Sequence, residues 1–308
     1  MSCVGPILYH GKCVRGNDVR VIDCASCGYA HLHPKPSEAA LEKYYQETYY
    51  GGDKPDYKAE IDRVADYQEV VYAAQARYLP TGLMDNESMW HLPVLEVGCG
   101  HDAPFLHYMA ENRLPRSDAP TLYGLDPGVV PYRFNSAGFN FKIVRKWDYL
   151  GMIPFAWIAL PFVLEHIHDP VEVLYRCRSH LATGGKLLLE VPFDFNPLQL
   201  SMRPEDDPAW WVSSPDHLNY FTPRSMEGLL CRAGLRMVHC ESTYPVELFI
   251  AQGQDYREDQ AAKNLLVEKR AYLQVLWADL GWGRPNVFSL SPYPLAGRTF
   301  WMVAEASK

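Results

Sequence analysis

One segment constrains the fold of this chain more than any other: a short apolar run that leads through a glycine turn into a helix. Pro93–Val97 is expected to be a buried strand, Gly98-Cys99-Gly100 the turn, and the residues from Asp102 to about Asn112 the helix. Such a turn sets the electropositive end of a helix beside backbone that carries no side chains. The segment therefore predicts a ligand site at the carboxyl end of a strand.

Strand and helix candidates continue to alternate over residues 92–240, which is the pattern of a parallel sheet with crossover helices. The expected fold class is α/β, with a Rossmann-like sheet of seven strands. Besides Pro93–Val97, strands are expected at residues 121–125, 139–144, 155–162, 186–191, 235–239 and 299–304. Residues 61–79 and 260–280 are expected to be helical, the second as an insertion before the last strand.

Composition narrows the class of protein. The 308 residues carry a formal net charge of -8, which argues against coating a nucleic-acid polymer or an anionic membrane. No apolar run approaches the roughly 20 residues of a membrane span, and the first residues lack the features of a signal peptide. We therefore expect a cytoplasmic protein without a membrane span or a nucleic-acid partner, as a monomer or homodimer.

Charge distinguishes between the two ligand families that such a turn serves, the dinucleotides and S-adenosylmethionine. Gly98, Gly100 and Ala103 also satisfy the spacing of a dinucleotide fingerprint. Glu96, however, lies two residues before the first glycine, and Asp102 lies where the helix is expected to begin. Two carboxylates repel a pyrophosphate but suit a ligand with an ammonium and a sulfonium group. The alternatives are a nicotinamide-dependent oxidoreductase, or carboxylates that only pack and cap the helix.

Three segments, in this order, resemble class I S-adenosylmethionine-dependent methyltransferases. They are Leu95–Gly100, Val163–Pro170 with its Val-Leu-Glu-His motif, and Leu181–Leu187. The resemblance covers roughly residues 90–242 and is nearest to the small-molecule branch that carries this motif. It implies a domain that transfers a methyl group from S-adenosylmethionine to a small acceptor.

The resemblance also implies which residues hold the cofactor. In the family, the turn lines the methionine end, the position of Asp126 binds the ribose diol, and the positions of Trp147 and Asp148 flank the adenine. The full set implied here is Glu96, Gly98, Cys99, Gly100, Asp102, Asp126, Trp147, Asp148, Leu164 and His166. Asp102 replaces a glycine of the family pattern and Ala156 an acidic residue. A degenerate, non-catalytic binding module is therefore the alternative.

Methyl transfer needs a base of near-neutral pKa to take the proton of the acceptor, and histidine meets that need. The segment Ser214–Phe221 resembles the histidine loop of sugar-modifying methyltransferases, which implies that His217 is the base. Tyr220 and Glu165 are further catalytic candidates. The alternative for His217 is a structural role, in which it and Asp216 only anchor the loop.

The first thirty residues hold two pairs of metal-ligand residues, His10-x-x-Cys13 and Cys24-x-x-Cys27. Two such pairs are typical of a zinc ribbon, in which four protein ligands close a structural site. The pattern predicts a structural zinc ion with these four residues as ligands, and Cys3, His31 or His33 as substitutes for His10. The alternative is a ribbon that has lost its metal.

Three units follow from these patterns. Residues 1–35 are expected to form the zinc-ribbon-like segment, 36–90 a helical segment and 91–308 the methyltransferase domain. Within that domain, 194–221 and 243–295 are expected to be insertions on the acceptor side. The resemblance to sugar methyltransferases implies an activated or nucleotide-linked sugar as acceptor, in polysaccharide or secondary-metabolite biosynthesis.

Overall fold

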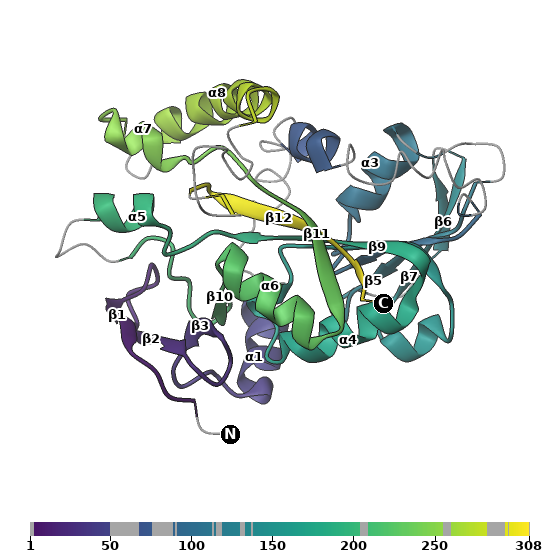
Figure 1. Ribbon diagram of the computed structural model, residues 1–308, viewed down its shortest axis with the longest axis horizontal. Helices are drawn as coiled ribbons and strands as arrows, with labels where there is room; N and C mark the ends of the chain where they lie inside the picture. The colour runs from purple at the N-terminus through teal and green to yellow at the C-terminus, as the bar shows by residue number, and fades with distance from the viewer. Residues whose placement is uncertain are drawn as a thin grey trace.

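The main sheet of the protein is mixed and carries helices on both faces. The computed structural model (Figure 1) describes residues 3–49, 68–75, 89, 91–112, 114, 119–129, 133–136, 138–203, 209–254, 260–281, 293–294 and 296–307. Within these residues the sheet has the order β11-β12-β9-β8-β4-β5-β7-β6. In chain order, its strands are β4 (Val94–Val97), β5 (Leu122–Leu125), β6 (Arg133–Ser136), β7 (Phe139–Val144), β8 (Phe155–Pro161), β9 (Leu181–Pro192), β11 (Leu235–Ser242) and β12 (Thr299–Ala306).

Strand direction confirms the Rossmann-like α/β fold. β7, β5, β4, β8 and β9 pair in parallel, whereas β12 is antiparallel to both β9 and β11. The seven strands expected from the sequence are all present. The described sheet also has an eighth strand, β6, which pairs antiparallel with β7. β6 was missed because its sequence, Arg-Phe-Asn-Ser, lacks the apolar run of a buried strand.

Two apolar cores lie on the two faces of this sheet because side chains alternate along each strand. In β8, Ile158 and Leu160 pack into one core and Trp157 and Ala159 into the other. Figure 1 shows α3 (Pro104–Asn112) above the sheet, and α4 (Pro170–His180) and α6 (Pro223–Arg232) below it. The helices thus cover both faces and leave the carboxyl ends of the parallel strands to the loops.

Helix starts follow their caps. Asp169 accepts hydrogen bonds from the backbone N–H groups of Val171 and Glu172, so α4 begins at Pro170. Thr222 caps α6 in the same way, through the N–H of Ser225. α3 begins at Pro104, so the position before its first residue is Ala103 and not Asp102.

A second sheet, of order β1-β2-β3-β10, joins the N-terminal segment to the domain that contains the main sheet. β1 (Ile7–Lys12), β2 (Asp18–Cys24) and β3 (Tyr29–Leu32) form a meander. The fourth strand, β10 (Asn219–Tyr220), comes from the loop before α6 and pairs antiparallel with β3. The N-terminal segment is therefore bonded, backbone to backbone, to the loop that carries His217.

Shorter elements complete the described chain. α1 (Glu38–Tyr44) and the π-helical η1 (Tyr45–Tyr49) follow the meander. Residues 68–75 are helical, and the rest of the helix expected at 61–79 lies outside the described residues. The remaining elements are the 3-10 helices η4 (Trp147–Leu150) and η5 (Leu164–His166), and the helices α5 (Pro197–Met202), α7 (Glu247–Ala251) and α8 (Gln260–Asp279).

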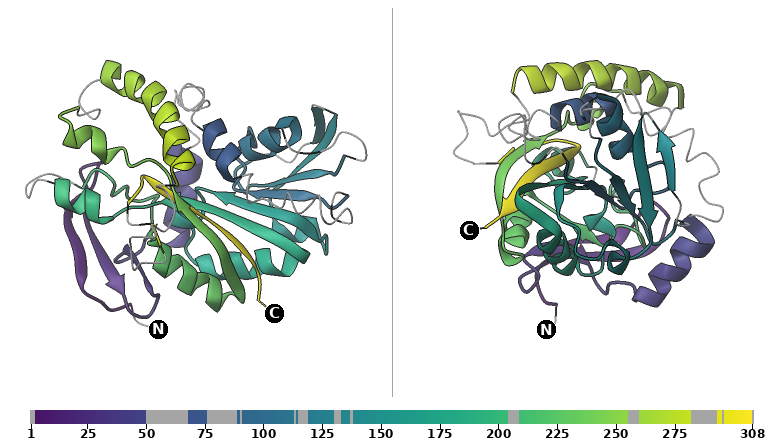
Figure 2. Two further views of the ribbon diagram at one scale, coloured as in Figure 1. Left: turned by 45° about the horizontal axis from the view of Figure 1, so that its top comes forward. Right: turned by 90° about the vertical axis from the view of Figure 1, so that its right-hand side faces the viewer.

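The helical insertion before the last strand is tied to the end of β11. The side chain of Gln274 in α8 accepts a hydrogen bond from the N–H of Tyr244 at 2.7 Å, and Trp277 Nε1 donates to the carbonyl of Ser242 at 3.0 Å. Figure 2 shows α8 on the same side of the sheet as α3. Among the described helices, none combines the length and the apolar character needed to cross a membrane.

The Gly124→Ala variant should unfold more easily than the parent. β5 passes so close to the glycine turn that a Cβ atom on Gly124 would lie 2.5 Å from Ile143 Cδ1 and 2.6 Å from Cys99 Sγ. Both partners are buried, so overpacking should lower the unfolding free energy by about 1–3 kcal/mol. Urea unfolding at neutral pH measures this loss.

Gly228→Ala is the matched control. Gly228 lies inside α6, and a Cβ atom there would meet no described atom within 4 Å. Alanine should therefore raise the unfolding free energy by about 0.5–1 kcal/mol. A Gly124→Ala variant as stable as the parent would contradict the packing of β5 against the turn.

Candidate active site

The glycine turn between β4 and α3 lies at the carboxyl end of the central strand. Gly98 and Gly100 have φ angles of 71° and 56°, in the left-handed region that glycine adopts without strain. A Cβ atom on Gly98 would lie 2.5 Å from Val163 Cγ2, whereas one on Gly100 would meet no described atom within 4 Å. Gly98 is thus needed for packing, and the backbone at Gly100 is open to a ligand.

Glu96 lies beneath the turn and does not face its mouth. Its side chain is 1% exposed, and its Oε2 accepts a hydrogen bond from the N–H of Leu106 at 3.1 Å. Burial raises the pKa of Glu96 to about 8, with a further contribution from the nearby Asp126. The carboxyl group is therefore mostly protonated at neutral pH. The expectation that Glu96 presents a carboxylate at the mouth of the turn is corrected, and of the two predicted carboxylates only Asp102 is exposed.

Asp126 follows β5 and holds the open side of the turn. Its Oδ2 accepts a hydrogen bond from the N–H of Gly100 at 3.0 Å, and its Oδ1 accepts one from the N–H of Gly128 at 2.8 Å. A carboxylate offers about four acceptor positions. These two bonds therefore leave capacity for the two hydroxyl groups of a ribose.

The other cofactor residues implied by the resemblance surround this turn unevenly. Asp102 is exposed at the turn, whereas Cys99 is buried behind it. Trp147 and Asp148 lie in η4, after β7, where the half-buried Trp147 ring lies 5.4 Å from His180 and Asp148 is exposed. Leu164 is fully buried in the core.

Glu165, His166 and His217 come together at the carboxyl end of β8. Their nitrogen and carboxylate oxygen atoms lie within 4.8 Å of one another, so they could exchange a proton or hold a cation. The His166 and His217 rings are 4.9 Å apart and nearly perpendicular. His166 Nδ1–H donates to the carbonyl of Asp216 at 2.9 Å, and its Nε2 lies 3.9 Å from Glu165 Oε1.

The acidic and phenolic groups around these histidines have pKa values shifted in different directions. Burial first, and then the carboxyl groups of Asp194, Glu190 and Asp216, raises the pKa of Glu165 well above its usual value. Burial also raises the pKa of Tyr220, again with help from Asp194 and Asp216. Burial would raise the pKa of Asp216 as well, but His217, Ser213, His166 and Arg15 hold it below its usual range. Asp216 is therefore the ionised partner of the histidine pair.

The His217 loop is also anchored. The N–H of His217 donates to the carbonyl of Ser213 at 2.8 Å, and the Ser213 hydroxyl donates to Asp216 Oδ1 at 2.8 Å. Tyr220 is 3% exposed and packs 5.3 Å from the Phe195 ring, in the core beneath the meander. The backbone of His217 and the side chain of Asp216 thus anchor the loop.

Sequence reasoning missed a set of buried polar residues, of which Glu190 and Asp194 act on Glu165 and the other two contact Asp194 or each other. They are at most 3% exposed: Glu190 in β9, Asp194 after it, Gln199 in α5 and Glu247 in α7. Gln199 Nε2 donates to Glu247 Oε1 at 2.9 Å. A glutamate inside the apolar run Leu187–Val191 was the available signal, because buried acids tend to mark functional sites.

Several acceptor atoms in this region make no hydrogen bond within the described part of the chain. They are Glu165 Oε1 and Oε2, Gln199 Oε1 and Glu247 Oε2. Buried polar atoms in folded proteins are nearly always paired with protein, water or ligand. The edge of the sheet beside Glu165 is therefore suited to a ligand that donates hydrogen bonds.

The predicted metal ligands do not all meet. Cys24 and Cys27 lie together with Cys3 and His31, whose ligand atoms are within 4.8 Å of one another. His10 pairs with Arg20 on the far part of the β1–β2 ladder, and the N–H of Cys13 donates to the carbonyl of Asn17 in the hairpin turn. The predicted set of His10, Cys13, Cys24 and Cys27 is therefore corrected. A β-strand rises about 3.3 Å per residue, so β2 itself separates the two pairs.

These features define a class of protein: a Rossmann-like sheet with helices on both faces, a last strand that runs antiparallel between β9 and β11, and a glycine turn after β4. The sequence family described as a methyltransferase domain matches residues 56–240, which is more than half of the chain. The chain belongs to this family and is a class I S-adenosylmethionine-dependent methyltransferase.

Solved structures with a similar fold are distant in sequence. The plantazolicin methyltransferase BpumL, solved in complex with SAH, is 10% identical with a TM-score of 0.48, over 87% of this chain and 95% of its own. A SAM-dependent methyltransferase from Archaeoglobus fulgidus is 19% identical with a TM-score of 0.42, over 77% of this chain and 93% of its own. No curated protein matches the chain.

The Glu96→Gln variant should remove a pH dependence of stability. The pKa of Glu96 rises from 4.5 to about 8 on folding, so the unfolded chain loses this proton first as the pH increases. The parent should therefore lose stability relative to the variant between pH 4.5 and about 8, by up to about 1.4 kcal/mol per pH unit. Urea unfolding across this range measures the difference.

The control for this experiment is Asp148→Asn, which alters an exposed carboxyl group. It should leave the pH profile of unfolding as in the parent. A constant offset between Glu96→Gln and the parent at every pH would mean that Glu96 is not held protonated in the fold.

Proposed function

We propose that this methyltransferase transfers the methyl group to a hydroxyl-rich small molecule, such as an activated or nucleotide-linked sugar, with His217 as the general base. The observation that carries the proposal is a set of buried acceptor atoms that make no hydrogen bond within the described residues. Those of Glu165 lie beside the histidine pair, and those of Gln199 and Glu247 lie in the polar cluster around Asp194. Sugar hydroxyl groups are donors that would satisfy them. The resemblance of the His217 loop to that of sugar-modifying methyltransferases supports the same class.

The residues proposed for the cofactor fit S-adenosylmethionine. The open backbone at Gly100, the carboxylate of Asp126 with spare acceptor positions, and the exposed Asp102 together suit a cationic nucleoside. When bound, the cofactor supplies a methyl group on a sulfonium, which is an activated leaving group. Catalysis then consists mainly of positioning the acceptor and removing its proton.

Charge states single out His217 among the three catalytic candidates. Burial raises the pKa of both Glu165 and Tyr220, which disfavours the deprotonated form that a base requires. His217 has the ionised Asp216 next to it, which stabilises the imidazolium formed when it takes a proton. His166, held by its bond to the Asp216 carbonyl, positions the His217 ring.

Replacing His217 with Ala should slow methyl transfer by about 10²–10⁴-fold, because a general base contributes about that much. Affinity for S-adenosylhomocysteine should stay within about a factor of two, since only the chemical step is affected. Turnover is measured with radiolabelled methyl donor, and affinity by calorimetric titration.

His91→Ala is the control for this prediction. His91 is exposed and precedes β4, at the end of the strand away from the glycine turn. It should leave both turnover and affinity unchanged. Unaltered turnover in His217→Ala would reduce His217 to a loop anchor.

The same assay tests the acceptor class. A panel of nucleotide-linked sugars, incubated with radiolabelled S-adenosylmethionine and the parent enzyme, should contain at least one substrate. A parent enzyme that binds S-adenosylhomocysteine but labels no hydroxyl-bearing acceptor in the panel would overturn the proposed substrate. A chain that does not bind S-adenosylhomocysteine would instead favour the non-catalytic alternative.

A further inference from the structure

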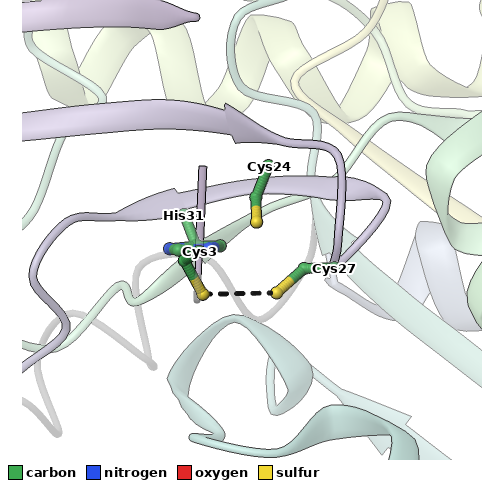
Figure 3. Close-up of side chains that lie close together, drawn as sticks. All are labelled: Cys3, Cys24, Cys27 and His31. Atoms are coloured by element: carbon green, nitrogen blue, oxygen red, sulfur yellow. Dashed lines mark hydrogen bonds between the residues drawn. The ribbon is translucent and has the colours of Figure 1, made fainter. Parts of the chain in front are cut away.

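Three cysteines and one histidine converge beside the meander sheet, outside the active site. Figure 3 shows the sulfur atoms of Cys3, Cys24 and Cys27 turned toward a common centre, with the His31 ring beside them. We infer that Cys3, Cys24, Cys27 and His31 bind one zinc ion, and that this ion fixes the loop that carries His217. The inference rests on the proposed function only in regarding that loop as part of the acceptor side.

The spacing of the ligand atoms matches a tetrahedral zinc site. With Zn–S bonds of about 2.3 Å, tetrahedral geometry separates two ligand sulfurs by about 3.8 Å. The Sγ atoms of Cys3 and Cys27 lie 3.8 Å apart, and all four ligand atoms lie within 4.8 Å of one another. Three thiolates and one imidazole are a ligand set of structural zinc sites.

The orientation of His31 is the independent observation. Its ring is 1% exposed, and Nδ1 lies 2.7 Å from the carbonyl oxygen of Leu32, so Nδ1 must carry the proton that it donates. Nε2 then presents its lone pair to the sulfur atoms, and it is a buried atom without a hydrogen-bond partner among the described residues. A backbone carbonyl on the second ring nitrogen is the arrangement that orients histidine ligands.

Zinc binding at this site needs no redox reaction and fills the coordination shell with protein ligands. The three thiols lose their protons to water as they bind, and neither the metal nor sulfur is oxidised or reduced. Four protein ligands leave no open position for a substrate or a reactive water. The ion is therefore structural, and its effect on the enzyme must pass through the strands that hold its ligands.

β3 provides that connection. His31 is paired with Asn219 of β10, and the Asn219 side chain donates to the carbonyls of Leu164 and Ile167, which flank Glu165 and His166. The N–H of Leu32 donates to the carbonyl of Leu218 at 2.9 Å. A metal ion that holds His31 in place therefore also holds β10, the strand that follows His217.

A second path runs through the same backbone. The N–H of Leu218 donates to the carbonyl of Glu165 at 2.7 Å. Loop 213–221 is therefore held between β3 on one side and η5 on the other. Loss of the metal should loosen β3, and with it the relative position of His217 and His166.

The metal site is tested first by zinc content. The purified parent should hold one zinc ion per chain, measured by metal mass spectrometry, and Cys3→Ser and His31→Ala should lose it. His31→Cys should restore it, because a thiolate replaces the imidazole. His10→Ala and Cys231→Ser are matched controls outside the cluster, at an exposed histidine and an exposed cysteine, and should keep it.

The ligand set can also be read on the unaltered chain. After chelation, cobalt(II) added to the parent should give the thiolate-to-cobalt absorption of a tetrahedral site with three sulfur ligands. A parent that binds neither zinc nor cobalt would overturn the site. So would loss of the metal in His10→Ala together with its retention in His31→Ala.

The link to the loop is tested by hydrogen exchange of the parent with and without zinc. Removing the ion should speed amide exchange of residues 213–221 by about tenfold or more, because local opening becomes easier. Exchange within α3 should stay unchanged, which serves as the internal control. Equal exchange of 213–221 in both states would overturn the positioning role of the ion.

These readouts do not involve methyl transfer. Failure of the proposed acceptor chemistry would leave zinc content and exchange as expected. A metal-free chain that still methylates a sugar would overturn the metal site alone.

Discussion

Parallel pairing of β5, β4, β8 and β9 is the constraint on which the active site depends. Because parallel strands end at the same edge of a sheet, it brings together the glycine turn after β4, Asp126 after β5 and η5 after β8. These residues are far apart in the sequence. No local propensity could have brought them together, and the helices on both faces only stabilise what the strand pairing arranges.

Desolvation sets the chemistry of this edge. Glu96, Glu165 and Glu190 are nearly inaccessible to water, and burial is the largest cause of the raised pKa of each. Their neutral forms can donate as well as accept hydrogen bonds, which suits them to hold a turn or a polar ligand. Asp216 is the exception, because histidines and an arginine around it keep it ionised. Groups with pKa values perturbed in opposite directions, such as Glu165 and Asp216, are typical of functional sites.

The N-terminal segment is connected to the active site, because its last strand, β3, pairs with β10, which follows His217 in the chain. A backbone ladder is stiffer than side-chain contact alone, and here it joins the cysteine–histidine cluster to the loop of His217. The small sheet thus ends in a strand, β10, that is hydrogen-bonded through Leu218 and Asn219 to the segment that contains η5. A shift of β3 in the N-terminal segment can therefore affect the active site through four hydrogen bonds, without a large movement of the chain.

The sequence by itself determined the strands of the main sheet, the starts of α4 and α6 and the glycine turn, because these depend on apolar alternation, caps and local backbone freedom. It did not determine β6, whose polar residues form a strand only beside β7. Only the tertiary structure decided that Glu96 faces inward and that Glu190 and Asp194 lie near Glu165. It also decided that Cys3 and His31, not His10 and Cys13, join Cys24 and Cys27. The reason is physical: spacing along a chain says which residues are neighbours in sequence, whereas desolvation and metal-ligand geometry depend on which strands meet.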